Sequence, residues 1–404
     1  MVILLPKYEI VILEGDAGVR EPLCFMRNQP APPPQLVEED RPNEAGMKSV
    51  PLSHTVIDSP ATSSYRVVQW ATGDVGARAL RAVIEHPNLA LAGVYAHSAD
   101  KVGRDAGELC GLGATGVTAT GSLDQILALG ADCVLYMPLR CDIDTVCRLL
   151  ESGANIVTTC GEFHRPASMD PAVRARVESA CQAGNTSIHS TGSSPGFITE
   201  AVPLVLSSIQ RELRNLTIEE YADMSQRDSP AIPFEIMGFG LPPAQFDTRR
   251  ADNLRHAFGP SLQLVADAIG LPLDTVDATA EVALARRRTE IVAGTLEAGT
   301  VAAQRITISG QHKGTALLRF RANWYCTTDI DAAWDLRPTG WRVRVDGDAP
   351  LDIEMRFPFP LTQMNEISPA YTANRPVNAI PFVCAAPPGI RTTVDLPTIT
   401  ASLA

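Results

Sequence analysis

Apolar and polar positions alternate in a regular rhythm from about residue 65 to residue 190. Short apolar runs bounded by glycine, proline or polar residues predict buried β-strands, and the amphipathic segments between them predict α-helices. The expected strands cover residues 66–71, 89–96, 117–119, 133–137, 155–159 and 187–190. The expected helices cover residues 74–85, 123–129, 144–151 and 171–183. Strands and helices that alternate at short intervals favour a parallel sheet with helices on both faces, the doubly wound α/β architecture.

The pattern changes after residue 196. We expect a helix over 196–209, a strand over 216–221, a segment rich in proline and glycine at 229–243, and a helix over 261–268. Five strand-like runs follow, at 277–285, 301–310, 315–324, 341–346 and 351–357. Such runs predict a mainly antiparallel sheet. The sequence therefore predicts a doubly wound domain at 65–197, an inserted α+β domain at 198–365 and a C-terminal segment at 366–404.

Residues 1–64 differ from the rest of the chain. Prolines cluster at 30–34, an acidic run follows at 38–40, and the stretch up to Ser64 is rich in serine, threonine and proline. This composition offers no periodic apolar pattern to bury and is typical of disordered segments. We therefore expect a disordered N-terminal extension, within which Met47 offers an alternative start. The first residues lack the basic start and long apolar stretch of a signal peptide, so none is expected.

A glycine-containing turn joins the first expected strand to the first expected helix, and it reads Ala71-Thr72-Gly73-Asp74-Val75-Gly76. It stands in the position of the G-x-G-x-x-G fingerprint, with alanine in place of the first glycine. Gly73 would let the backbone approach a pyrophosphate at the helix N-terminus, and Gly76 would let the helix lie closely against the strand. We predict that this turn makes a Rossmann-type nicotinamide-dinucleotide site. Asp74 fits poorly beside a phosphate, and the alternative is that it caps the helix.

The choice between NAD and NADP is expected at the end of the second strand. NAD enzymes usually carry an acidic residue about 20 positions after the fingerprint, where it binds the ribose hydroxyls. No acidic residue stands directly at this strand end, whereas Ser98, Lys101 and Arg104 offer groups for a 2′-phosphate. We therefore predict NADP, while Asp100 keeps NAD open. The alternative for Lys101 and Arg104 is a solvated loop.

Two further strand ends border the crevice in which doubly wound sheets bind their ligands. Met137 and Pro138 end the fourth expected strand and are candidates for the wall of the nicotinamide site. Glu162 and His164 follow the fifth, and they place a carboxylate and an imidazole where the substrate should lie. A partly buried glutamate beside a cofactor can act as a general base or hold an ammonium group. The alternative is a turn-capping Glu162 and a hydrogen-bonded His164 without a chemical role.

Composition narrows the class of partner. The 404 residues carry 34 lysines and arginines against 46 aspartates and glutamates, and this net charge of −12 argues against nucleic acid as the main partner. The nine cysteines include no C-x-x-C pair, so we predict neither a disulfide framework nor a metal site. No apolar run approaches the roughly 18 residues that a membrane helix needs. We expect a cytoplasmic homodimer that acts on a small molecule.

Four segments make the sequence resemble the 2,4-diaminopentanoate dehydrogenases and the related native amine dehydrogenases. They are VVQWATGDVG at 67–76, VGRDAGEL at 102–109, NIVTTCGEF at 155–163 and RPVNAIP at 375–381. The resemblance extends from about Tyr65 to Pro397. Many members are labelled dihydrodipicolinate-reductase-like, but the paired-histidine segment and the K-x-D-x-P-S-G-T loop of the true reductases do not occur in this chain. That label therefore describes the N-terminal fold and not the reaction.

The resemblance implies an enzyme that acts on a C–N bond. In this family the glutamate after the fifth strand handles ammonia or the imine while NAD(P)H delivers hydride, and Glu162 looks like its counterpart. The family also implies that the segment at 366–404 returns to the cofactor domain, which makes Asn378 a candidate for substrate binding; the alternative is a turn-stabilising asparagine. Two other functions stay open, a carbonyl or cyclic-imine reductase like dihydrodipicolinate reductase and a non-catalytic NADP-binding sensor. Only the sensor has no need of the Glu162 carboxylate.

Overall fold

The computed structural model describes residues 9–12, 24–27, 64–228, 230–247 and 249–402. The chain divides into two units, Met1–Ser59 and Pro60–Ala404. In the first unit, strands β1 (Glu9–Ile12) and β2 (Cys24–Arg27) pair in an antiparallel sense. Apart from these strands and Ser64, the extension predicted at 1–64 lies outside the described residues.

The larger unit contains a seven-stranded parallel sheet with the strand order β17-β8-β7-β6-β3-β4-β5. From β3 the chain proceeds to β4 and β5 on one side and then crosses to β6, β7 and β8 on the other. Ligands of doubly wound sheets bind at this reversal, outside the carboxyl ends of the strands. The strands are β3 (Tyr65–Trp70), β4 (Leu89–Tyr95), β5 (Ala119–Thr120), β6 (Cys133–Tyr136), β7 (Asn155–Thr158), β8 (Ser187–Ser190) and β17 (Gly389–Arg391).

Helices cover both faces of this sheet. Successive strand residues point to opposite faces, and the neighbours Val134 and Leu135 of β6 accordingly belong to two different cores. The Val134 core contains residues of α4 and α5, and the Leu135 core contains residues of α1 and α8. The predicted doubly wound α/β class is confirmed. The helices of this layer are α1 (Asp74–Glu85), α2 (Ala106–Leu109), α3 (Leu123–Leu127), α4 (Ile143–Glu151), α5 (Pro171–Gly184) and α8 (Met364–Cys384).

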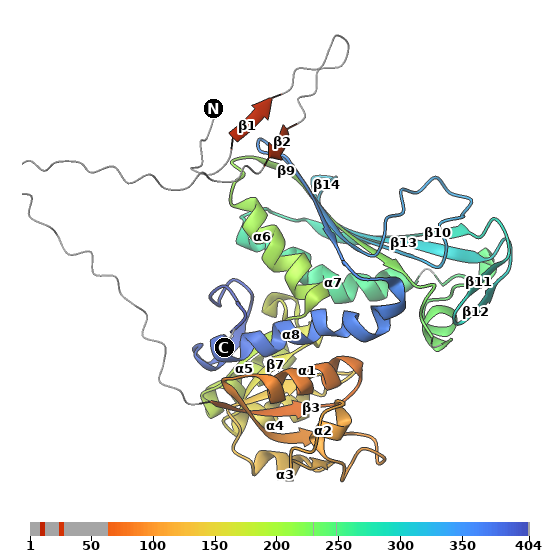
Figure 1. The fold of residues 1–404 in the computed structure, drawn as a ribbon. Helices are drawn as coiled ribbons and strands as arrows, with labels where there is room; N and C mark the ends of the chain where they lie inside the picture. Colours follow the sequence, from red (N-terminus) through yellow and green to blue (C-terminus); the bar gives the residue numbers. More distant parts are fainter. Residues whose placement is uncertain (1–8, 13–23, 28–63, 229, 248, 403–404) are drawn as a thin grey trace, which may run out of the picture. The chain divides into compact units, whose positions relative to one another are not determined.

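Helix α8 comes from the far end of the chain and lies alongside α1 (Figure 1). The local sequence predicts no helix here, because Pro369, Pro376 and Pro381 lie within the segment and proline disfavours a helix interior. Val377 and Ile380 are buried in the core that α8 shares with α1 and the sheet. This packing outweighs the local preference of the sequence. After α8, the chain adds β17 beside β8 at the edge of the sheet.

The second sheet has six strands in the order β10-β13-β14-β9-β15-β16. Strands β14 and β9 pair in parallel, and the other neighbouring pairs are antiparallel. The prediction of a mainly antiparallel sheet is confirmed. Strands β11 (Thr289–Ile291) and β12 (Gly294–Leu296) form a separate hairpin. The strands of the large sheet are β9 (Leu213–Asp223), β10 (Thr275–Leu284), β13 (Val301–His312), β14 (Thr315–Tyr325), β15 (Gly340–Gly347) and β16 (Leu351–Arg356).

Helix α7 (Arg249–Ala268) packs against this sheet, and the short helix α6 (Val202–Ser207) contacts α7 and strand β15. Phe258 of α7 stacks on Phe320 of β14 with 4.2 Å between the ring centroids. The sequence predicts this helix only from residue 261, directly after Pro260, but the structure continues it through the proline back to Arg249. Of the helices in the described part of the chain, none has both the length and the apolar character needed to cross a membrane.

Candidate active site

The predicted phosphate-binding turn lies between β3 and α1. Gly73 is the residue before the first turn of α1, and a Cβ atom placed on it would meet no protein atom within 4 Å. Gly76 is the opposite case, because a Cβ atom there would lie 2.2 Å from the carbonyl oxygen of Ala71. Open space at Gly73 and close contact at Gly76 are what phosphate approach and tight helix packing require. The turn therefore fits the pyrophosphate of a dinucleotide.

Ala71 takes the place of the first glycine of the fingerprint and has a φ of 72°, in the left-handed region that glycine adopts most easily. A non-glycine residue in this region costs about 1 kcal/mol. Two hydrogen bonds hold the strained residue: its N–H donates to the carbonyl of Tyr95 (2.9 Å), and its carbonyl accepts from Nε2 of Gln69 (2.8 Å). Local strain explains why the fingerprint prefers glycine at this position.

Asp74 does not cap α1, so the alternative role suggested for it by the sequence, that of the helix cap, is wrong. A capping side chain belongs to the residue that precedes the helix, whereas Asp74 is the first helical residue and the cap position is held by Gly73. The N–H groups at the start of α1 receive no side-chain hydrogen bond from the cap residue, which suits an anion site.

The carboxylate of Asp74 interacts electrostatically with Arg227, a half-buried arginine that follows β9. Burial lowers the pKa of the Arg227 guanidinium, and the carboxylates of Asp228 and Asp74 act in the opposite direction. Nη1 of Arg227 donates to Oδ1 of Asn365 at 2.9 Å. This cation near the turn is missed by sequence reasoning, because it lies far from the fingerprint along the chain and matches no motif.

The three residues predicted to bind a 2′-phosphate follow β4. Lys101 is half-buried, and its Nζ donates to the carbonyl oxygen of Thr72 at 2.8 Å, which ties this loop to the glycine turn. Ser98 and Arg104 are exposed, and Nε of Arg104 lies 3.7 Å from a carboxylate oxygen of Glu108. Exposed pairs of this kind contribute little to stability. Of the three, the structure brings Lys101 into contact with the turn.

The predicted nicotinamide wall lies at the end of β6. Met137 is buried, and together with Val75 it packs in the core between the sheet, α1 and α8. Pro138 is half-buried, and its carbonyl oxygen accepts a weak hydrogen bond from Sγ of Cys160 at 3.8 Å. Pro138 is therefore the more accessible of the two predicted wall residues.

Glu162 projects from the short 3₁₀ helix η1 (Gly161–Phe163), which follows β7. The fully buried side chain of Phe163 anchors this helix, and Glu162 beside it is exposed. Glu162 lines a pocket of about 600 Å³. Its lining comes from the segments after β6 and β7, from α4 and α5, and from α7. Other lining residues are Cys141, Ile143, Val173, Asn253, His256 and Pro260.

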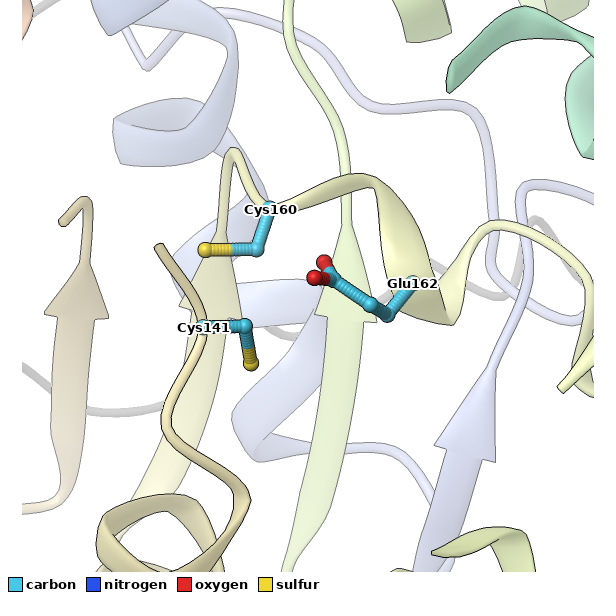
Figure 2. Close-up of side chains that lie close together, drawn as sticks. All are labelled: Cys141, Cys160 and Glu162. Carbon is cyan, nitrogen blue, oxygen red and sulfur yellow. The ribbon is translucent and has the colours of Figure 1, made fainter. Parts of the chain in front are cut away.

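Two cysteines adjoin Glu162, whose carboxylate reaches toward them (Figure 2). Cys141 follows β6 and Cys160 follows β7, and because these strands are hydrogen-bonded neighbours, their carboxyl ends bring the thiols together. The two Sγ atoms and a carboxylate oxygen of Glu162 lie within 4.8 Å of one another. The hydrogen bond between the thiols lowers the pKa of Cys160 and raises that of Cys141. The sequence does not reveal this group, because it forms only through the order of the strands.

His164 is buried and is not among the residues that line this pocket. Its Nδ1 lies 2.6 Å from Oε1 of Glu200, which is fully buried. Glu200 also accepts hydrogen bonds from Oγ of Ser261 (2.6 Å) and from the hydroxyl of Thr393. Burial alone raises the pKa of Glu200, but the attraction of His164 and these hydrogen bonds outweigh it and hold that pKa below its ordinary value. The His164 imidazole thus faces a buried carboxylate, and its predicted contact with substrate stays a prediction.

Asn378 lies half-buried on α8, which packs on α1 and on strands β6, β7 and β8. One turn earlier, Nε of Arg375 donates to the hydroxyl of Thr191, which follows β8, at 3.0 Å. The segment at 366–404 thus contacts the parallel sheet. Within the described residues, the lining of the Glu162 pocket does not include Asn378.

The chain matches two protein families. Residues 197–404 match the family described as the 2,4-diaminopentanoate dehydrogenase C-terminal domain, and residues 67–157 match the family described as the dihydrodipicolinate reductase N-terminus. The first match covers the second sheet, α7 and α8. The second covers the strands from the glycine turn to β7.

Two individual proteins are similar over most of their length. An amine dehydrogenase from Streptomyces virginiae is 28% identical over 347 residues, which cover 82% of this chain and 95% of the relative. The solved structure of an amine dehydrogenase from Mycobacterium smegmatis has a TM-score of 0.67 at 19% identity, over 84% of this chain and 98% of the other. At this level of identity the solved structure supports a shared fold.

Proposed function

The chain belongs to the 2,4-diaminopentanoate dehydrogenase family, and from this premise we propose that it interconverts a ketone and an amine. As predicted from the sequence, it is a pyridine-nucleotide-dependent oxidoreductase. In the proposed reaction, a ketone and ammonia, or a preformed imine, are reduced to an amine at the expense of NAD(P)H. Oxidative deamination is the reverse reaction.

The observation that carries the proposal is the position of Glu162. Its carboxylate is exposed on the wall of a pocket of about 600 Å³ at the carboxyl end of β7. Pockets of this size suit small organic molecules. Strand β7 is separated from β3, which leads into the glycine turn, by β6 alone. At about 4.8 Å per strand, β7 lies about 10 Å from β3, a distance that a dinucleotide bound at the turn can span, and this supports the proposal.

A carboxylate suits the chemistry of C–N bond reduction for two reasons. Its negative charge stabilises an ammonium or iminium group, and it can accept a proton when ammonia attacks the carbonyl carbon. Proton transfer by a well-placed side chain contributes about 10²–10⁴ to the rate of a reaction. We infer that Glu162 binds the nitrogen of the substrate and moves this proton.

The cofactor contacts proposed here follow the geometry of the turn. Gly73 and the N–H groups at the start of α1 would hold the pyrophosphate, and Lys101 with Ser98 and Arg104 would hold the ribose and a 2′-phosphate. Met137 and Pro138 would border the nicotinamide. When bound, the nicotinamide supplies the hydride, and the protein supplies orientation and charge. We propose NADP as the preferred cofactor, on the strength of the two basic side chains after β4.

The substrate is proposed to lie between Glu162 and α7. Asn253 and His256 of α7 line the same pocket and would offer hydrogen-bonding groups to the part of the substrate that does not react. Asn378 and His164 lie outside this lining. Since His164 touches Glu200, its part is positioning: it holds the segment that carries Glu162 against the second domain.

A substrate screen tests the proposal. NADPH and NADH oxidation is followed with short ketones and keto acids, with and without ammonium. We expect oxidation that depends on both the ketone and ammonium, and an amine as the product. Reduction of the ketone without ammonium would favour the carbonyl reductase, and cofactor binding without turnover of any ketone would favour the sensor. The same preparation, examined by sedimentation, tests the predicted homodimer.

A further inference from the structure

Two thiols and a carboxylate lie close together beside the Glu162 pocket, and we propose that Cys141, Cys160 and Glu162 form a binding site for Zn²⁺. Two thiolates with one carboxylate are a donor set that zinc favours, whereas Mg²⁺ and Ca²⁺ prefer oxygen ligands alone. Cys141 and Glu162 both line the pocket, so the fourth coordination position faces a space that water or a ligand can enter. The sequence predicts no metal site because it contains no C-x-x-C pair, and the proposed site differs from that prediction.

The spacing of the donor atoms suits a tetrahedral ion. Zinc bonds of about 2.3 Å to sulfur and 2.0–2.2 Å to oxygen place two sulfurs about 3.8 Å apart and a sulfur and an oxygen about 3.5 Å apart. In this protein the two Sγ atoms and the Glu162 oxygen lie within 4.8 Å of one another. The separations therefore exceed those of a zinc site by no more than about 1 Å, a difference on the scale of side-chain rotation.

The backbone that carries the thiols is fixed by its own hydrogen bonds. The N–H of Cys160 donates to the hydroxyl of Thr158 at 3.0 Å, and its carbonyl accepts from the hydroxyl of Ser190 at 2.6 Å. Cys141 directly precedes Asp142, the residue that caps α4. Rigid supports of this kind hold the ligands of a site close to the geometry that binding requires.

The charges around the group also favour a cation. Zinc binds thiolates, so each thiol must lose its proton on binding. The surroundings of the thiols are negatively charged, because the Glu162 carboxylate lies within 4.8 Å of both and Asp142 directly follows Cys141. With both thiols ionised, the three ligands carry three negative charges within 4.8 Å, and a divalent cation relieves their mutual repulsion.

The consequence for the enzyme rests on the proposed function. A zinc ion on Glu162 takes the carboxylate that we assign to the substrate nitrogen, so zinc should inhibit turnover and a chelator should restore it. The site itself does not depend on that assignment. Binding is therefore measured without any enzymatic readout.

The test is a titration of the reduced full-length chain with Co²⁺, a spectroscopic substitute for Zn²⁺, followed by the thiolate-to-cobalt charge-transfer absorption. We expect the band to saturate at one Co²⁺ per chain and to disappear when Zn²⁺ but not Mg²⁺ is added. Cys141→Ser and Cys160→Ser should each weaken binding by more than about tenfold, since loss of even an outer partner of a metal ligand typically costs roughly 10–100-fold. Glu162→Gln should weaken it as well. Cys110→Ser is the matched control, because Cys110 donates to a carbonyl of α2 instead and should leave the band unchanged.

Absence of the band in the reduced wild-type chain, or its survival in both cysteine variants, overturns the proposal. A second measurement covers variants that fail to fold: Zn²⁺ should protect Cys141 of the wild-type chain from alkylation and leave Cys110 reactive, and equal labelling of Cys141 with and without Zn²⁺ contradicts the site. Cobalt binding in a protein that shows no ammonium-dependent turnover would refute the proposed function and leave the site standing. Turnover that Zn²⁺ does not affect, in a protein that binds cobalt, would refute only the inhibition.

Discussion

A single methyl group, added at Gly73 or at Gly76, should separate cofactor binding from folding. At Gly73 the backbone has φ −71° and ψ −172°, which any residue adopts, and the new Cβ would meet no protein atom within 4 Å. Gly73→Ala should therefore change the free energy of unfolding by no more than about 0.5 kcal/mol. The methyl group fills the space that we assign to the pyrophosphate. Loss of one charge-assisted hydrogen bond, about 1.5–3 kcal/mol, should raise the Kd for NADPH by about 10- to 150-fold.

At Gly76 we expect the added methyl group to lower the stability of the fold. The new Cβ would lie 2.2 Å from the carbonyl oxygen of Ala71, so α1 or the turn must shift by about 1 Å to restore ordinary contact. Overpacking costs about 1–3 kcal/mol, and the higher helix propensity of alanine returns up to about 1 kcal/mol. A net loss of about 1–2 kcal/mol should lower Tm by about 2–4 °C.

Thermal unfolding without cofactor and fluorescence titration with NADPH measure the two quantities on both variants. If Gly73→Ala binds NADPH as tightly as the wild type, the pyrophosphate does not lie at this turn. If Gly76→Ala unfolds at the wild-type temperature, the close packing of α1 on the turn does not exclude a side chain at position 76.

Three further predictions concern the cofactor, the N-terminus and pH. Replacing both Lys101 and Arg104 with Ala should weaken NADPH binding by at least about tenfold more than NADH binding, and equal weakening would argue against NADP. A chain that starts at Ser63 should unfold at the wild-type temperature, since the residues before it lack a core pattern; a loss of several degrees would show that they pack. Burial lowers the pKa of His189 to about 4, below its unfolded value of about 6.5, so stability is lost as pH falls through this range. Urea unfolding at pH 7.5 and at pH 5.5 measures the free energy of unfolding. Its decrease between the two pH values should be about 1.3 kcal/mol larger in the wild type than in His189→Gln. Equal decreases would contradict a buried neutral imidazole.

The parts of the fold that local patterns determine could be predicted from the sequence. Helix α1 has the expected bounds, because a glycine turn begins it and one apolar stripe with Ala79 and Val83 runs along its buried side. Helix α8 could not be predicted, because its three prolines oppose a helix locally and only packing against α1 and the sheet compensates for them.

The candidate site divides in the same way. The glycine turn and Glu162 could be located from the chain, because each directly follows a recognisable strand. The contact of His164 with Glu200 and the approach of Cys141 to Glu162 could not, because they join separate segments and depend on strand order and on the placement of the second domain. Arg227 could not be located from the sequence either, since only the tertiary fold brings it close enough to Asp74 for their charges to interact.

The central claim is that Glu162 handles the nitrogen of the substrate, and the turnover of Glu162→Gln in metal-free buffer tests it most directly. Glutamine keeps the size and the hydrogen bonding of the side chain but removes its charge and its proton acceptor. Glu151→Gln is the matched control, since Glu151 is an exposed glutamate at the end of α4. We predict that turnover falls by about 10²–10⁴ in Glu162→Gln and not in the control, while the Kd for NADPH and Tm stay close to wild type. Wild-type turnover with a lowered Tm would instead show that Glu162 stabilises its turn, and would contradict the proposed mechanism.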